Sequence, residues 1–287
     1  MRSTNRFVRT VASTVLCLAV LASASFAAKK PISAPQGLAV DAKGNLYVAN
    51  SGGNNILVYS PGYVQLTAKT ITQNITNPTS VAFDPQGNLW VATAAATNGT
   101  SYGSVAEYVN GKQNTSATIT DSIVYPTGIA IDGVGNVWVA NNYNNITVYC
   151  SPYVYAPPTR LVRTFSPAPP IFSIAVAKGT LAWGTSNAVN LISASPTLAF
   201  GEEDGFGWSN DTGVGLGADA SGNIYMANND GSVNVAAPGY EYSFAQLGFN
   251  PIGVAVDSVR GRVYFSNYAA STIAVYSTSG AFLKTIQ

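Results

Sequence analysis

The sequence contains no histidine, and this absence removes several catalytic designs at once. Without an imidazole, neither a Ser-His-Asp nor a Cys-His nucleophile can be assembled, and no His-ligated zinc site can form. Only two cysteines are present, Cys17 and Cys150, and Cys17 lies in an N-terminal segment that we expect to be removed. Cys150 then has no partner for an intramolecular disulfide, so we expect it to be a small buried hydrophobe.

Charged residues are also scarce: they make up 9% of the chain, whereas 47% of the residues are hydrophobic. A chain of 287 residues with this hydrophobic content can bury a core and is not disordered. Residues 1–27 are typical of a cleavable secretory signal peptide, because Arg2, Arg6 and Arg9 precede a short apolar run that ends in small residues. We therefore predict a secreted or periplasmic protein.

Removal of residues 1–27 takes away three of the 14 basic residues and none of the 13 acidic ones, which leaves 11 basic against 13 acidic residues. This balance gives no indication of a nucleic-acid or anionic-membrane partner. The apolar part of residues 1–27 is shorter than the ~20 residues that span a bilayer, so we expect no membrane span in the mature chain. No linker interrupts residues 28–287, and we predict one domain, which we expect to be monomeric.

One motif recurs along that domain, first at residues 35–50 (PQGLAVDAKGNLYVAN) and again at 77–93 and 125–141. Each copy has an apolar run that ends in Asp, the turn Asp-x-x-Gly-Asn, and a second apolar run. The Asp carboxylate can accept backbone N–H groups two residues on, and Gly supplies a position with positive φ. The motif therefore predicts a β-hairpin.

The hairpin motif is repeated six times. Its Asp falls at positions 41, 84, 132, 219 and 257, at intervals of 38 to 48 residues apart from one interval of 87. Residues 173–185 fill that longer interval as a degenerate copy without the Asp. A period of about 40–45 residues with four short strands is typical of a propeller blade. We predict an all-β, six-bladed β-propeller of four-stranded antiparallel blades.

The repeat resembles the NHL-repeat family and the related six-bladed propellers, through PIGVAVD at 251–257, GNLYVA at 44–49 and the Val-Tyr of the third strand. The resemblance covers residues 34–287 and implies the fold rather than an activity, because propellers host unrelated functions. Some relatives are histidine-dependent lyases, whose chemistry this chain cannot run in the same way. Gluconolactonase-like propellers are the nearest metal-dependent enzymes, but this chain lacks their Pro-Asp-Gly segments.

The carboxylates outside the repeat concentrate in one stretch, 201–211. Calcium prefers six to eight oxygen ligands, several of them anionic, and four side chains here are candidates: Glu202, Glu203, Asp204 and Asp211. An acidic run is more commonly a solvated loop. We predict no cofactor, but a metal-dependent hydrolase or lyase with calcium in this stretch is the alternative function.

The residue that closes the second strand is commonly Asp in the NHL family but is neutral in all six copies here. One reading is a ring of neutral amides and aromatic rings that binds a glycan, a peptide or a protein partner. The other reading is that these Asn residues cap turns. The first reading predicts a non-catalytic binding scaffold whose ligand-binding residues are Asn50, Asn141, Tyr143, Trp208, Asn228 and Asn267.

Few residues are available to pair with the last blade, since only 29–33 remain ahead of the first blade for this role. The last blade also finishes its own fourth strand at 281–286. We therefore expect the ring to close mainly by apolar packing between the faces of the first and last blades.

Overall fold

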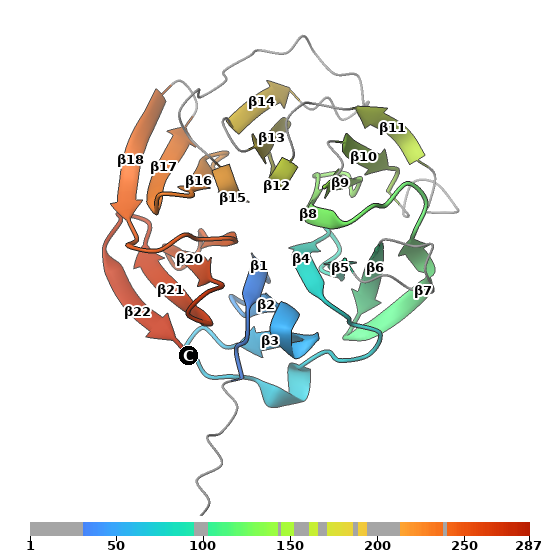
Figure 1. The fold of residues 1–287 in the computed structure, drawn as a ribbon, viewed down its shortest axis with the longest axis horizontal. Helices are drawn as coiled ribbons and strands as arrows, with labels where there is room; N and C mark the ends of the chain where they lie inside the picture. The colour runs from blue at the N-terminus through green and yellow to red at the C-terminus, as the bar shows by residue number, and fades with distance from the viewer. Residues whose placement is uncertain are drawn as a thin grey trace, which may run out of the picture.

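The computed structural model describes residues 31–94, 103–142, 145–151, 161–165, 171–185, 189–193, 213–237 and 240–287. Six antiparallel sheets surround a central axis, and each consists of strands that are consecutive in the sequence (Figure 1). The prediction of a six-bladed all-β propeller is confirmed. The described residues contain no α-helix, and their two short 3-10 helices are not long enough to cross a membrane.

The first three blades contain eleven strands. Blade 1 comprises β1 (Pro35–Val40), β2 (Leu46–Asn50) and β3 (Asn55–Tyr59). Blade 2 comprises β4 (Pro78–Phe83), β5 (Leu89–Thr93), β6 (Ser104–Val109) and β7 (Lys112–Ile119). Blade 3 comprises β8 (Pro126–Ile131), β9 (Val137–Asn141), β10 (Asn145–Tyr149) and β11 (Leu161–Phe165).

The last three blades also contain eleven strands. Blade 4 comprises β12 (Ile171–Ala177), β13 (Thr180–Thr185) and β14 (Val189–Ser193). Blade 5 comprises β15 (Gly213–Ala218), β16 (Ile224–Asn228), β17 (Ser232–Ala237) and β18 (Tyr240–Gln246). Blade 6 comprises β19 (Val254–Asp257), β20 (Arg262–Asn267), β21 (Thr272–Ser277) and β22 (Phe282–Ile286).

Blades 1 and 4 each have three strands among the described residues. In blade 1 the outer position is taken by a segment that contains the 3-10 turn η2 (Thr67–Lys69) and makes only two isolated bridges to β3, Tyr59↔Gln65 and Ile56↔Ile71. The other 3-10 turn, η1 (Ser51–Gly53), joins β2 to β3. The degenerate repeat forms blade 4, and its missing Asp turn is replaced by a two-residue hairpin at Lys178 and Gly179, with φ of 44° and 79°.

The core lies between neighbouring blades, because both faces of most strands are covered. Six clusters of buried side chains follow the ring, and one of them joins the first blade to the last. In that cluster Ile32 and Leu38 pack with Ile273 and Ile286. Cys150 is buried and has a free thiol, as expected.

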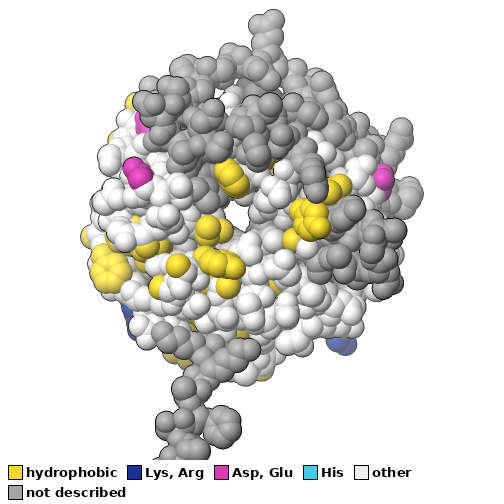
Figure 2. Space-filling view, viewed as in Figure 1, with side chains coloured by type: hydrophobic (Ala, Val, Ile, Leu, Met, Phe, Trp, Pro, Cys, Tyr) yellow, Lys and Arg dark blue, Asp and Glu magenta, His cyan; other side chains and the backbone are white. Residues whose placement is uncertain are grey.

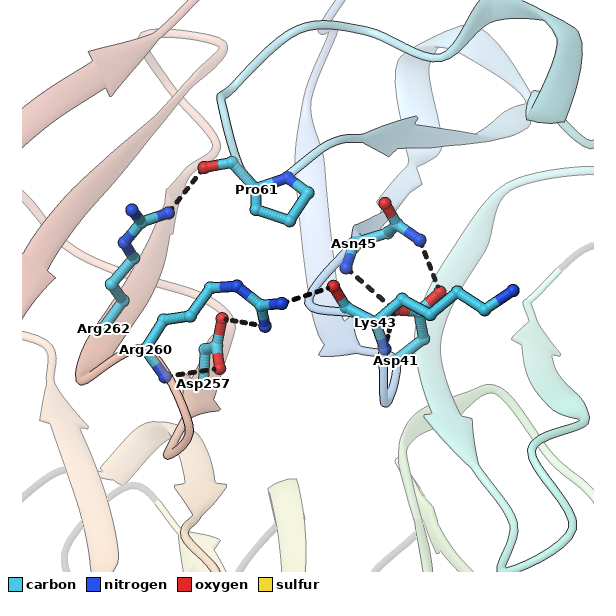
Figure 3. A network of polar contacts seen from close by, with 7 residues as sticks. All are labelled: Asp41, Lys43, Asn45, Pro61, Asp257, Arg260 and Arg262. Atoms are coloured by element: carbon cyan, nitrogen blue, oxygen red, sulfur yellow. Dashed lines mark hydrogen bonds and ion pairs between the residues drawn. The ribbon is translucent and has the colours of Figure 1, made fainter.

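Among the described residues no strand is shared between blades 6 and 1, since β22 pairs with β21 and β1 pairs with β2. Apolar packing across the seam agrees with the expectation from the sequence. Arginine side chains add polar contacts: Arg260 donates to the carbonyl oxygen of Lys43 at 2.8 Å and Arg262 to that of Pro61 at 2.6 Å (Figure 3). Near the central axis, a Cβ on Gly253 would collide with the carbonyl oxygen of Gln36. The chain at the start of blade 6 can therefore approach β1 of blade 1 this closely only because residue 253 is glycine.

Candidate functional site

A central channel of about 210 Å³ runs between the first strands of the blades. Figure 2 shows its opening, with hydrophobic side chains around it, while the charged side chains of the described residues that are visible on that face lie at its periphery. All six blades contribute to the wall, which is formed by residues 36–38, 79–81, 127–129, 172–174, 216 and 252–254. None of these residues is charged, so the described part of the channel wall carries no ionised acid or base.

The hydroxyl groups of the channel wall mostly connect one blade to the next. The first strands of blades 1 to 5 have a β-bulge here, and Thr79 and Thr127 occupy the extra position in blades 2 and 3. Thr79 Oγ1 donates to the carbonyl oxygen of Pro126 at 2.7 Å, and Thr127 Oγ1 donates to that of Ile171 at 3.0 Å. Ser173 is an exception, because its side chain is only 8% exposed and its Oγ has no hydrogen-bond partner.

The repeat carboxylates hold the turns between the first and second strands, as the sequence predicted. Asp84 Oδ1 accepts the backbone N–H groups of Gln86 and Asn88 at 3.0 and 2.8 Å. Its Oδ2 accepts from Asn88 Nδ2 and from the indole Nε1 of Trp90 at 3.2 and 3.0 Å. Backbone donors are arranged in the same way around three other aspartates: Asp41, Asp132 and Asp219.

The indole contact was not anticipated from the sequence, although a signal for it was present. Tryptophan follows the turn aspartate by six residues in two copies, as Trp90 and Trp138, and Trp138 Nε1 donates to Asp132 at 3.2 Å. In two other copies this position is Tyr47 or Tyr225. The turn aspartates of the two repeats that contain Trp therefore accept one more hydrogen bond than those of the repeats that contain Tyr.

The strand-closing residues Asn50 and Asn141 are completely buried. Asn50 Oδ1 accepts the N–H of Ser33 at 2.6 Å, and its Nδ2 donates to the carbonyl oxygen of Pro31 at 3.0 Å. Asn141 Oδ1 accepts the N–H of Val124 at 2.9 Å in the same manner. Each amide therefore holds the segment that enters its blade, 17 residues earlier, which is the capping role that the sequence left open as the second reading.

Asn228 and Asn267 differ from those two. Asn228 is 2% exposed and donates from Nδ2 to Ser232 Oγ at 3.1 Å, while its Oδ1 has no partner in the described part of the chain. Asn267 is partly exposed, and its Oδ1 accepts the N–H of Ala270 at 3.0 Å within the turn that follows. These hydrogen bonds do not join any two of the four asparagines to each other.

The remaining candidates lie outside the described residues: Tyr143 and Trp208 for ligand binding, and Glu202, Glu203, Asp204 and Asp211 for calcium. Within the described ranges, no three side chains of the types His, Cys, Asp and Glu are placed to hold a metal ion.

In each blade, the connection from the second to the third strand directly follows the strand-closing residue. These connections lie at one end of the ring and form an exposed surface there. We call this surface the loop face. Asn142 and Asn229 are exposed, and Tyr268 exposes 47% of its surface. The described part of the loop face carries two acidic residues, Asp121 and Asp230. Hydrogen bonds from the hydroxyl and N–H of Ser232 hold the pKa of the Asp230 carboxyl below its usual value.

A model of the NHL repeat matches residues 33–59, which comprise β1, β2 and β3. The chain is a β-propeller with an NHL repeat. A comparison with curated proteins found no match.

Solved structures support the same fold. A streptogramin B lyase is 14% identical, with a TM-score of 0.62 over 90% of this chain and 84% of the lyase. A chain of a nidogen/laminin complex is 15% identical, with a TM-score of 0.64 over 85% and 93%. Virginiamycin B lyase from Staphylococcus aureus is 14% identical, with a TM-score of 0.60 over 88% and 83%. At these identities the likeness shows the propeller fold alone.

Proposed function

We propose that this protein is an exported, non-catalytic β-propeller that binds a neutral polar ligand, a glycan or a peptide, or a protein partner on its loop face. The observation that carries the proposal is the composition of the described loop face, which exposes amide side chains and the ring of Tyr268. Such groups donate and accept hydrogen bonds without charge, and an aromatic ring supplies a flat apolar surface.

The position of the carboxylates also supports binding rather than catalysis. Asp41 and Asp84 hold turns at the end of the blades opposite the loop face, since the β1–β2 and β2–β3 connections leave β2 at opposite ends. The described wall of the central channel is uncharged. Among the structural neighbours, one title names a protein–protein complex and two name lyases, so the fold is compatible with either class. The absence of histidine from the whole sequence favours a binding function over a lyase activity.

The proposal is tested by screening the full chain on glycan and peptide arrays and repeating the positive measurements in solution. Tyr268→Ala combined with Asn142→Ala is expected to weaken binding at least tenfold, because it removes an aromatic contact and an amide from the loop face. Tyr240→Ala is the matched control, since Tyr240 is 64% exposed but lies on the outer strand β18. Equal loss with the control, or no loss with the double variant, would overturn the assignment of the face.

The alternative function, a calcium-dependent hydrolase or lyase, has its own inexpensive test. A calcium site should raise the thermal midpoint of the full chain as calcium is added, because a ligand that binds only the native state stabilises it. Replacement of Glu202, Glu203, Asp204 and Asp211 by the corresponding amides should then abolish the rise.

A further inference from the structure

A groove of about 780 Å³ lies between blades 1 and 2, away from the loop face. Its lining comes from the β1–β2 turn, the outer segment of blade 1 around η2, the β4–β5 turn, and the β6–β7 turn. The volume falls within the range of about 300–1,000 Å³ that is usual for small-molecule sites. None of the residues that were selected from the sequence as ligand or metal candidates lines it.

Three lysines line the groove: Lys43, Lys69 and Lys112. Each is exposed, and the single ion pair found among the described residues joins Arg260 to Asp257, so none of the three ammonium groups is neutralised by an ion pair in that part of the chain. Lys43 takes part in the seam network only through its backbone, and its side chain extends away from that network (Figure 3). The three positive charges therefore line the groove without an ion-pair partner among the described residues.

Two carboxylates also line the groove, but both are directed into their own turns. Asp41 accepts from the N–H groups of Lys43 and Asn45 at 2.9 and 2.8 Å and from Asn45 Nδ2 at 2.7 Å. Asp84 is 6% exposed and accepts four donors of its own turn and strand. A ligand in the groove meets ammonium groups at its rim, whereas the carboxylates are already surrounded by hydrogen-bond donors.

The wall of the groove between the lysines is aromatic. Tyr47 and Phe83 come from neighbouring blades and form an edge-to-face pair with ring centroids 4.9 Å apart and an interplanar angle of 85°. Both rings are only partly buried, and Tyr108 lies behind them almost completely buried. The groove thus combines half-buried apolar rings with separated positive charges.

We propose that this groove binds an acidic oligosaccharide, with carboxylates opposite the lysines and a sugar ring against Tyr47 and Phe83. Three ammonium groups on separate segments suit an anion whose charges are spread along its length. No arginine lines the groove, and arginine is the residue whose planar fork grips phosphate and nucleic acid in two-point contacts. The uncharged channel and the loop face play no part in this site.

The probe for this site is a defined uronic-acid oligosaccharide, and its methyl ester is the uncharged control ligand. Isothermal titration with the full chain is expected to show binding of the acid and at least tenfold weaker binding of the ester. Affinity for the acid should also fall as salt is raised, because the contacts are exposed ion pairs. Lys69→Gln with Lys112→Gln should weaken binding about tenfold, as expected for the loss of two such pairs.

The matched control is Lys178→Gln with Lys284→Gln, which removes the same charge from exposed positions outside the groove. It should leave the affinity unchanged. Equal weakening in both variants would show that only overall charge matters and would overturn the site. Preferential binding of inorganic polyphosphate or a single-stranded oligonucleotide would overturn the ligand class. Tyr268 does not line the groove, so the Tyr268→Ala variant should still bind the uronic-acid oligosaccharide. The proposal for the groove and the proposal for the loop face can therefore fail independently.

Discussion

Arg260 Nη2 donates to the carbonyl oxygen of Lys43 at 2.8 Å, across 217 residues of sequence. The same guanidinium group reaches Asp257 through Nη1 at 3.3 Å, and the Arg260 N–H donates to Asp257 Oδ1 at 3.0 Å. One side chain therefore fixes the turn of blade 6 and attaches that turn to blade 1. Since no strand is shared across the seam among the described residues, this contact is one of the polar links that hold blades 6 and 1 together.

Arg260→Ala is expected to lower the free energy of unfolding by about 1–3 kcal/mol, because the Asp257 carboxylate, 4% exposed, loses a charged donor. Urea denaturation measures the change. Limited proteolysis should also show earlier cleavage at the seam than elsewhere. Lys112→Ala, at an exposed position of blade 2 away from the seam, serves as the control and should change the stability by less than ~0.5 kcal/mol. Equal stability of the two variants would show that apolar packing alone closes the ring.

Asp84→Asn should destabilise the protein more than Asp219→Asn. An amide nitrogen in place of Asp84 Oδ2 would face two donors, Asn88 Nδ2 and Trp90 Nε1, whereas Asp219 Oδ2 accepts only from Asn223 Nδ2. We expect losses of about 2–4 kcal/mol and about 1–2 kcal/mol, from unfolding monitored by circular dichroism. A loss at Asp219 as large as at Asp84 would contradict a role for the indole.

These turns explain why so much of the fold could be predicted from the sequence. The Asp, the Gly with positive φ and the Asn that form a turn such as 41–45 are neighbours in the chain, so each turn is encoded locally. Six copies then specify six blades. Even the degenerate copy was placed correctly, because Lys178-Gly179 supplies the same reversal with fewer residues.

The candidate site could be predicted only in part. Asn50 looked like a surface residue because it closes a strand, but its burial depends on Pro31 and Ser33, which return to it from outside the hairpin. The groove lysines come from three segments whose proximity depends on how blades 1 and 2 pack. Nothing local in the sequence encodes either relationship.

The third-strand tyrosines give a prediction with a pH dependence. Burial raises the pKa of Tyr59, Tyr108 and Tyr149 to about 12. In the unfolded chain these phenols ionise near pH 10, as in model peptides, so between about pH 10 and 12 the unfolded state binds fewer protons and stability falls as pH rises. Below the unfolded pKa the contribution is fully present. Denaturant midpoints between pH 8 and 12 should show a plateau followed by this decline.

Tyrosine-to-phenylalanine variants separate the contribution of these hydroxyls as hydrogen-bond donors from their contribution as ionisable groups. Tyr108 OH donates to the carbonyl oxygen of Gln73 at 2.9 Å, whereas Tyr59 OH is buried without a partner. Tyr108→Phe should lower the free energy of unfolding by about 1 kcal/mol at pH 8, and Tyr59→Phe should leave it unchanged or raise it. Both variants should show a shallower alkaline decline, since one phenol fewer ionises. A decline that both variants leave unaltered would show that other groups control alkaline unfolding.

The last prediction concerns the buried asparagines. Asn141 has both ends of its amide satisfied, by Val124 N–H on Oδ1 and by Asn145 and Thr147 on Nδ2. Asn228 uses only its Nδ2, toward Ser232, and leaves Oδ1 buried without a partner. Asn141→Ala leaves the partly buried N–H of Val124 without its acceptor and should cost about 1–3 kcal/mol, whereas Asn228→Ala removes an oxygen with no partner among the described residues and should cost less than about 1 kcal/mol.

Hydrogen exchange provides a second measurement for the same pair. The amide proton of Val124 should lose protection in Asn141→Ala, because its only acceptor is removed, while protection elsewhere in blade 3 is retained. If ligand binding rather than capping were the role of Asn141, the exchange of Val124 would be unchanged and array binding would be lost instead. If capping is its role, array binding should survive in any variant that remains folded, because the side chain is completely buried.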